Sequence, residues 1–246
     1  MNECPPYMGR ILYKLVSKIT GVKDPFKKIK MQSNRMALKL YPELKKKIRK
    51  SSDSLLTAVT LAIVGNIIDY GAKHSFDIDK ETKAILNPDF DVHNTHRKAI
   101  FDYDAFKKAL DNTDSVLYIA DNAGEVVFDK VLIEEMNKKV IYVVRENPII
   151  NDALKEDAII CGIDKVARIT SSGCDGPGVM LQYCNKKFLK LFNSAQMIIS
   201  KGQGNFEALS NVKSRPIFFL FRVKCDVVGR HLGFQIGDII LKSNLR

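Results

Sequence analysis

The spacing of apolar residues along the chain changes near residue 112. Up to about Leu110, apolar residues recur at steps of three and four positions, as Leu55, Val59 and Ile63 do. This is the periodicity of a helix that buries one face. The pattern therefore predicts an all-helical N-terminal lobe over residues 1–112.

Beyond residue 112, short apolar runs rich in β-branched residues alternate with longer stretches of helical spacing. Five such runs are Ser115–Ala120, Lys139–Val144, Lys165–Thr170, Met197–Ser200 and Pro216–Phe221. Fully apolar strands separated by helices are typical of a parallel sheet that helices cover on both faces. Residues 113–246 are therefore predicted to form an α/β domain, in which a last short run, Asp238–Leu241, is expected to add an edge strand.

A polar loop begins directly after each of four successive strands of this predicted sheet. They cover residues 121–125, 145–152, 171–177 and 201–207, and each contains glycine or is rich in Asp and Asn. In open α/β sheets, ligands bind outside the carboxyl ends of the strands. We therefore expect these loops to gather at one rim of the sheet and to form the functional site.

Asp121 and Asn122, directly after the first run, offer hard oxygen atoms of the kind that Mg²⁺ and Mn²⁺ prefer. Asp152 ends the loop after the next run, and neighbouring strands lie about 4.8 Å apart, so its carboxylate can converge on the same ion. An alternative gives the same residues structural roles. Asn122 and Glu125 have the spacing of a helix capping box, and Asp152 would favour a helix N-terminus electrostatically. The residues alone leave both interpretations open.

Lys201 stands at the end of a strand and before the glycines of Lys201-Gly-Gln-Gly-Asn205. A cation in this position can bind phosphate oxygens and offset charge in a transition state. The alternative is an ordinary residue of the rim. The run lacks the third glycine of a dinucleotide fingerprint and the GK[ST] ending of a P-loop, so neither nucleotide motif is present.

Three further polar positions have both a functional and a structural interpretation. Asp175 lies in a Ser- and Gly-rich loop whose backbone N–H groups either bind an anion or simply turn the chain. Asn66 and Asp69 lie one turn apart in an apolar helix. An inward-facing pair needs a partner, for example at an active-site cleft, whereas an outward-facing pair is only solvated.

The formal net charge of +11 comes from the first 50 residues, which hold 14 Lys and Arg but only three acidic residues, whereas the rest of the chain is balanced. A basic segment raises a rival function, a non-enzymatic binding module for nucleic acid or acidic partners. However, the lysines interleave with apolar residues as on solvated helix faces, and few aromatic residues lie near them to stack on bases. We therefore expect no specific nucleic-acid partner.

Composition also bears on location. No apolar run reaches the ~18 residues that a membrane-spanning helix needs, and the start lacks the apolar segment of a signal peptide. The five cysteines are an odd, scattered set without a Cys-x-x-Cys pair, which argues against a disulfide framework or a zinc ribbon. The sequence therefore predicts a cytoplasmic protein without a membrane partner, and it leaves the oligomeric state open.

Five strings taken together resemble the damage-control phosphatase family, and specifically its stand-alone archaeal and bacterial branch. In order along the chain they are Gly65-Asn-Ile-Ile-Asp69, Asp121-Asn-Ala-Gly-Glu125, Asn147-Pro-Ile-Ile-Asn-Asp152, Asp175-Gly-Pro-Gly178 and Lys201-Gly-Gln-Gly-Asn-Phe-Glu207. The resemblance extends over most of the chain. It implies a Rossmann-like three-layer α/β/α core with a mainly parallel sheet, joined to the N-terminal all-helical lobe. One difference is at the start, where members of the branch often carry a Cys-x-x-Cys pair and this chain reads Cys4-Pro-Pro-Tyr7.

The resemblance also implies a phosphatase for small phosphorylated metabolites, dependent on one divalent ion, Mn²⁺, Co²⁺, Ni²⁺ or Mg²⁺. The expected residues are Asp121, Asn122 and Asp152 for the metal; Asp121 and Lys201 for catalysis; and Asn66, Asp69, Glu125, Asn151, Asp175, Lys201 and Asn205 for the substrate. In this scheme Lys201 and Asn205 line the phosphate pocket, and the two residues of the helical lobe close it.

Two phosphatase mechanisms fit this set of residues. Either the metal activates a water molecule, or Asp121 attacks phosphorus and forms an aspartyl-phosphate. A second Asp two residues after a nucleophilic Asp is absent, because position 123 is Ala. We therefore favour water as the nucleophile and Asp121 primarily as a ligand. A Rossmann-like methyltransferase is another alternative, but Asp121-Asn-Ala-Gly-Glu125 is too acidic to suit the loop that its cofactor needs.

Overall fold

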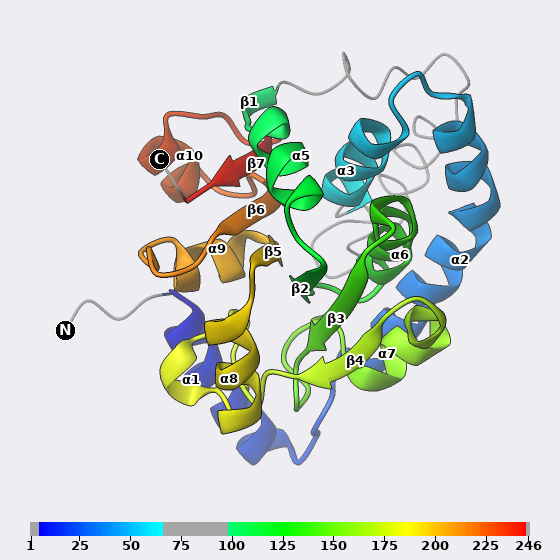
Figure 1. The fold of residues 1–246 in the computed structure, drawn as a ribbon. Coiled ribbons are helices and arrows are strands. Elements are labelled where there is room, and N and C mark those ends of the chain that lie inside the picture. Colours follow the sequence, from blue (N-terminus) through cyan, green and yellow to red (C-terminus); the bar gives the residue numbers. More distant parts are fainter. Residues whose placement is uncertain (1–4, 66–97, 245–246) are drawn as a thin grey trace.

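A computed structural model of the protein describes residues 5–65 and 98–244, and its centre is a sheet with helices on both faces (Figure 1). The described strands are β1 (Lys98–Phe101), β2 (Ser115–Ile119), β3 (Lys139–Val144), β4 (Arg168–Ser171), β5 (Met197–Lys201), β6 (Ile217–Arg222) and β7 (Ile239–Ser243). They form one seven-stranded sheet in the order β1-β7-β6-β5-β2-β3-β4. All neighbours are parallel except β6 and β7, which are antiparallel. The expected α/β class with a mainly parallel sheet is confirmed.

Every apolar run predicted as a strand overlaps one, but two expectations at the end of the sheet are wrong. The run 238–241 belongs to β7, which lies between β1 and β6 and is not an edge strand. The edge is β1, which falls inside the segment whose spacing predicted helices. Four residues are too few to distinguish strand alternation from helical periodicity in the sequence. The segment is a strand because it pairs with β7.

Helices cover the two faces of the sheet in two apolar layers. They are α1 (Pro5–Thr20), α2 (Lys27–Lys50), α3 (Ser54–Val64), α5 (Tyr103–Asp111), α6 (Glu125–Met136), α7 (Lys155–Ile160), α8 (Lys186–Ser194), α9 (Gln203–Leu209) and α10 (Asp226–Leu232), with short 3-10 turns at Ile163–Lys165 and Leu181–Tyr183. One layer joins α2, α3, α5, α6 and α7 to the sheet in a continuous core, and the other joins α8, α9 and α10 to the opposite face. The N-terminal helices α2 and α3 therefore share a core with the sheet, and the expected division at residue 112 stays a prediction.

The alternation of side chains along β2 shows how the strand serves both layers. Tyr118 packs in the layer of α6, whereas Leu117 and Ile119 pack in the layer of α8 and α9. Successive residues of a strand point to opposite faces, so a strand buried on both faces must be apolar throughout.

The strand order has a switch point between β2 and β5. From β2 the chain moves through β3 to β4 on one side, whereas β5 pairs with the other side of β2 and is followed by β6. Ligands in open α/β sheets bind outside the carboxyl ends of the strands at such a point. The segments after β2 and β5 contain Asp121, Asn122 and Asn205, and Lys201 is the last residue of β5.

Helix α1 differs from the other long helices because its apolar residues remain exposed. Leu12, Leu15 and Ile19 are 62%, 51% and 74% exposed. The helix contacts α9, beside which it lies in Figure 1. Among the described helices, none combines the length and the apolar character needed to cross a membrane.

Candidate active site

The three expected metal ligands lie together at the rim of the sheet. Asp121 and Asn122 follow β2, and Asp152 lies in the loop between β3 and α7. Asn122 and Asp152 form an isolated antiparallel bridge, and the backbone N–H of Ala153 donates to the carbonyl oxygen of Asp121 at 2.8 Å. The two loops are thus joined by backbone hydrogen bonds, which hold their side chains in register.

Each of the three side chains makes its hydrogen bonds through one of its two terminal atoms. The other terminal atom is in each case an oxygen without a hydrogen bond among the described residues. The amide nitrogen of Asn122 donates to Asp121 Oδ2 at 3.0 Å and to Glu125 Oε1 at 2.9 Å, which fixes the orientation of the amide. Arg145 Nε donates to Asp152 Oδ2 at 2.7 Å. Within the described part of the chain, no hydrogen bond reaches Asp121 Oδ1, Asn122 Oδ1 or Asp152 Oδ1. Three hard oxygen donors without a partner fit a divalent cation.

The electrostatics of this group also favour a cation. Burial raises the pKa of Asp121 well above its usual value, the charges of Glu125 and Asp152 raise it further, and Lys224 and Arg145 act in the opposite direction. Burial likewise raises the pKa of Asp152, against the effect of Arg145. Carboxylates gathered without enough positive charge are destabilised in their ionised form, and a bound cation reverses this effect.

The donor set is mixed. The described residues contain no group of three or more His, Cys, Asp or Glu side chains that could hold a metal ion. The candidate ligands instead combine two carboxylates with the amide oxygen of Asn122, a combination that suits Mg²⁺ or Mn²⁺.

The structural alternative for Asn122 is wrong. Helix α6 begins at Glu125, its N-cap is Gly124 with a φ of 84°, and the N–H of Gly124 donates to Asn34 Oδ1 at 2.8 Å rather than to Asn122. At α7, Asp157 accepts a hydrogen bond from the N–H of Leu154 at 2.9 Å, whereas Asp152 is engaged by an arginine. Asn122 therefore bonds to the side chains of Asp121 and Glu125, and Asp152 bonds to Arg145, so neither residue caps the helix that follows it.

A cavity of about 340 Å³ opens above this group. Asp121, Asn122, Asn151 and Asp152 line it, as does Lys224 from the segment after β6. Sequence reasoning missed Lys224, although the position carries a signal, because it follows a predicted strand just as the four polar loops follow theirs. The N-terminal end of α1 forms another wall of this cavity.

Lys201 lies beneath the cavity rather than in its wall. Its side chain is 1% exposed, and its ammonium group contacts Asp129 Oδ1 at 2.6 Å and Glu125 Oε2 at 3.1 Å. Burial lowers the pKa of Lys201, but the two carboxylates outweigh burial and raise it overall. Tyr118 and Tyr142 each donate to Asp129 at 2.7 Å. The expected contact of Lys201 with phosphate stays a prediction, and the structure shows a link from Lys201 through Glu125 to the candidate metal ligands.

Asn205, in the first turn of α9, is fully buried and uses its whole side chain to join strand ends. Its oxygen accepts from Arg145 Nη2 at 3.0 Å and from the N–H of Val179 at 2.9 Å. Its nitrogen donates to the carbonyl oxygens of Ala120 at 3.0 Å and Lys201 at 2.7 Å. Like Lys201, Asn205 is not among the residues that line the cavity, and its expected role in substrate binding stays a prediction.

Gly202 shows why the turn between β5 and α9 needs a glycine. Its φ is +81°, and a Cβ there would collide with the carboxylate of Asp121. The glycine lets the backbone approach the ligand group closely, as expected for a site at the switch point.

Two buried residues that sequence reasoning missed support the rim from below. Arg145 is 2% exposed and connects Asp152 to Asn205. Asp129 is fully buried in α6, where it accepts the hydrogen bonds of Lys201 and two tyrosines. The available signals were a charged residue directly after the run 139–144 and an acid one helical turn after Glu125 in an otherwise apolar segment.

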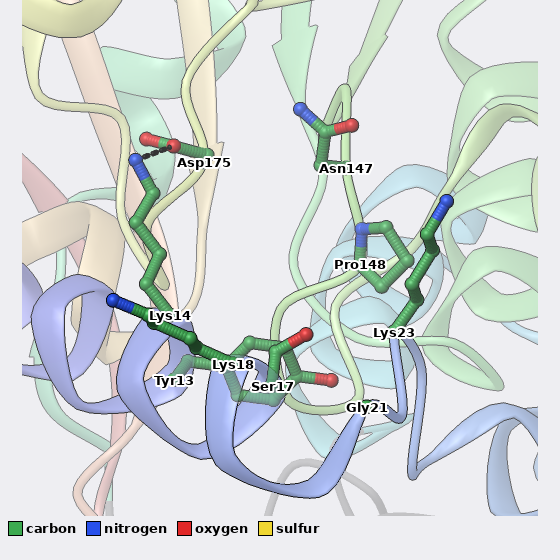
Figure 2. A pocket seen from close by; sticks show the side chains of 9 residues that line it. All are labelled: Tyr13, Lys14, Ser17, Lys18, Gly21, Lys23, Asn147, Pro148 and Asp175. Atoms are coloured by element: carbon green, nitrogen blue, oxygen red, sulfur yellow. Dashed lines mark ion pairs between the residues drawn. The ribbon is translucent and has the colours of Figure 1, made fainter.

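Other expected site residues lie elsewhere. Asp175 pairs with Arg10 and with Lys14, the latter at 2.5 Å, and lines a different cavity (Figure 2). Burial raises the pKa of Asp175, but its two cationic partners outweigh burial and lower it. Asn66 and Asp69 lie outside the described residues, as does Cys4.

Comparison with known proteins identifies the class. The chain belongs to the damage-control phosphatase ARMT1-like family, whose domain model matches residues 2–240. It is therefore an enzyme of the phosphatase class.

Relatives that match nearly the whole of this chain are known from Pyrococcus horikoshii and Archaeoglobus fulgidus. The damage-control phosphatase PH1575 of Pyrococcus horikoshii is 35% identical over 99% of this chain and 83% of its own length. A damage-control phosphatase of Archaeoglobus fulgidus is 33% identical over 96% of this chain and 81% of its own. The crystal structure of the Pyrococcus horikoshii protein, described there as a DUF89 family protein, superposes with a TM-score of 0.82 at 36% identity, covering 96% of this chain and 80% of that one. The fold and the family thus agree.

Proposed function

We propose that this phosphatase hydrolyses phosphate monoesters of small metabolites, such as sugar phosphates, in metabolite damage control, and that it uses one divalent ion, Mn²⁺, Co²⁺, Ni²⁺ or Mg²⁺. The observation that carries the proposal is the group of unpartnered oxygens, Asp121 Oδ1, Asn122 Oδ1 and Asp152 Oδ1, on residues that line one cavity. A divalent ion held by these atoms would polarise the phosphoryl group and lower the pKa of a water molecule.

The residues around the ligands have distinct tasks in this proposal. The carboxylates of Asp121 and Glu125 orient the amide of Asn122, because both accept from its nitrogen. Arg145 occupies one oxygen of Asp152 and leaves the other free. Lys224 stands in the cavity wall, where its ammonium group can bind the phosphate oxygens of the substrate.

Lys201 acts in this proposal as a positioning residue. It neutralises Glu125 and Asp129 in a region without solvent, and Glu125 in turn orients Asn122. The second possibility is the direct contact with phosphate that the strand-end position suggested, which would require the ammonium group to exchange a carboxylate for the substrate. Water remains the favoured nucleophile, since Ala123 offers no acid or base beside Asp121.

We also propose a reducing, cytoplasmic location. All four described cysteines, Cys161, Cys174, Cys184 and Cys225, are free thiols. Free thiols persist where the redox environment keeps them reduced, which supports this location.

The test is a phosphatase assay on a panel of sugar phosphates after the metal has been stripped and Mn²⁺, Co²⁺, Ni²⁺ or Mg²⁺ has been restored separately. The expected result is no turnover in chelator and recovery with at least one ion. Full turnover in chelator would refute the metal dependence, and no hydrolysis of any phosphate ester with any ion would refute the proposed substrate class.

A further inference from the structure

A second and larger cavity lies next to the candidate active site. Its volume is about 460 Å³, within the range of pockets that bind small molecules. It lies between the C-terminal half of α1 and the loop after β3. In Figure 2, Lys14 and Lys23 stand on opposite sides of the cavity, and Asn147 and Pro148 face it from the loop.

The walls of this cavity carry unbalanced positive charge. Lys14, Lys18 and Lys23 line it together with one carboxylate, Asp175. That carboxylate is already paired with Arg10 and Lys14. Within the described residues, no carboxylate lies within ion-pair distance of Lys18 or Lys23. Two ammonium groups, which lie on opposite sides of the cavity in Figure 2, therefore remain without a carboxylate partner among these residues.

The cavity also presents an unused hydrogen-bond donor. Tyr13 lines it, and the hydroxyl group of Tyr13 is buried without a hydrogen-bond partner among the described residues. Buried hydroxyl groups normally have a partner, so the hydroxyl group of Tyr13 has a hydrogen bond left to make. Burial raises the pKa of Tyr13 to about 12, so the group carries its proton and can donate it to an anion.

The two cavities share two walls. The first turns of α1, including Gly9, line the cavity above the candidate metal ligands, and Lys14 and Lys18 of the same helix line the second. The loop after β3 contributes Asn147 to one cavity and Asn151 to the other. With a rise of 1.5 Å per helical residue, the two lysines lie about 8 to 14 Å beyond Gly9 along the axis. A molecule that reaches from one cavity into the other would extend along this part of α1.

We propose that the second cavity binds a phosphate group at the far end of the substrate, so that the preferred substrates are small metabolites with two phosphate groups separated by a sugar or a chain of similar length. The proposal rests on the proposed function for the reacting phosphate, which lies over Asp121. Lys18, Lys23 and Tyr13 hold the second phosphate, which is not hydrolysed there.

The variant that tests this proposal is Lys18→Gln with Lys23→Gln. The matched control is Lys107→Gln with Lys108→Gln on α5, which removes the same charge from exposed positions that line neither cavity. KM and kcat are measured on the metal-loaded enzyme with a sugar bisphosphate and with the corresponding monophosphate. We expect the ratio of the bisphosphate KM to the monophosphate KM to rise about tenfold in the test variant, a change that corresponds to about 1.4 kcal/mol, and to stay constant in the control.

A binding measurement separates this inference from the proposed function. Calorimetric titration of the metal-free full chain with the sugar bisphosphate is expected to give a Kd about tenfold weaker for the test variant than for the control. Equal Kd values, or an unchanged KM ratio, would overturn the inference. Binding of inorganic phosphate that depends on Lys18 and Lys23, together with no KM advantage for the bisphosphate, would show a separate anion site and also overturn it. Loss of binding in the test variant with no hydrolysis of any ester would reject only the proposed function.

Discussion

Asn122 and Asp152 face each other as bridge partners, although they belong to different loops that follow adjacent strands. Because of this bridge, the candidate ligands are held in place by the ends of two paired strands and not by one loop alone. Because every residue of β2 pairs with a residue of β3, the spacing of the two loops is set by the sheet. A rigid sheet thus positions the side chains on which the proposed chemistry depends.

Removal of either carboxylate of this set is expected to abolish metal-dependent turnover. Asp121→Ala and Asp152→Ala each delete one of three hard ligands, and replacement even of groups that only support a ligand typically costs 10- to 100-fold. We expect a loss of kcat/KM of at least about 100-fold, with an unchanged far-UV circular dichroism spectrum. Asp164→Ala, an exposed acid outside the site, is the control. Full turnover of both ligand variants in chelator would contradict the metal site.

Asp121→Asn is expected to make the metal-free protein more stable while it inactivates the enzyme. The pKa of Asp121 is raised well above its usual value, first by burial and then by Glu125 and Asp152, so its ionised form is unfavourable in the fold. A neutral amide of the same shape removes this effect. We expect a rise in Tm of the metal-free protein by about 2 to 4 °C, the shift that ~1 kcal/mol produces in a chain of this size. A lower Tm for this variant, measured by calorimetry in chelator, would show that the carboxylate is not repelled there.

Lys201→Met is expected to lower both activity and stability. The substitution leaves Glu125 and Asp129 buried without their cation, which typically costs about 3–5 kcal/mol. A loss of one preorganised electrostatic group lowers kcat by on the order of 10² to 10³. Chemical denaturation and steady-state kinetics measure the two effects separately.

A second variant decides which role Lys201 has. Lys201→Met combined with Asp129→Asn removes one of the two unpaired charges and is expected to restore part of the stability. If Lys201 only positions Glu125 and Asn122, activity should recover with stability. If Lys201 contacts phosphate, kcat should stay low in a protein that is stable again.

The orientation of Lys201 illustrates what the sequence could and could not predict. The strand-end rule correctly placed Asp121, Asn122 and Asp152 together, because sheet geometry determines which loops meet. The alternation along β5 also predicts the side of the sheet to which Lys201 points. Met197 and Ile199 face the layer of α6, and Lys201 is the next residue on the same face. Nothing in the spacing, however, identified Asp129 as its partner, because such pairing depends on how a helix is placed over the sheet.

The same limit explains the other differences. Asp175 follows β4 as expected, but it pairs with Arg10 of α1 and lines the second cavity, and the position of α1 over the rim leaves no periodic signal in the sequence. Strand β1 is recognisable only through its pairing with β7. Local patterns thus predicted the strands of the α/β part, whereas β1 and the contacts between distant elements had to come from the structure.

Lys224→Gln is expected to weaken substrate binding. The residue lines the cavity and is exposed, and its charge lowers the pKa of buried Asp121, so the substitution is expected to raise that pKa as well. The substitution removes a charge-assisted contact with phosphate, which solvent weakens because the lysine is exposed. We therefore expect kcat/KM to fall about tenfold. Lys213→Gln, an exposed lysine in the loop before β6, is the control. An unchanged kcat/KM in both variants would remove Lys224 from the proposed site.

The basic segment formed by the first 50 residues is expected to bind polyanions only weakly and without sequence preference. Part of its charge is already used inside the fold, because buried Lys30 pairs with Asp24 at 2.8 Å, and Lys45 pairs with Glu134 at 2.9 Å. The remaining exposed lysines offer general attraction that fades with salt. Titration with single-stranded and duplex oligonucleotides at physiological ionic strength should give a Kd of about 10⁻⁴ to 10⁻⁶ M, the range of non-specific binders. Tight, sequence-selective binding, together with no phosphatase activity for any metal, would instead favour a nucleic-acid-binding module.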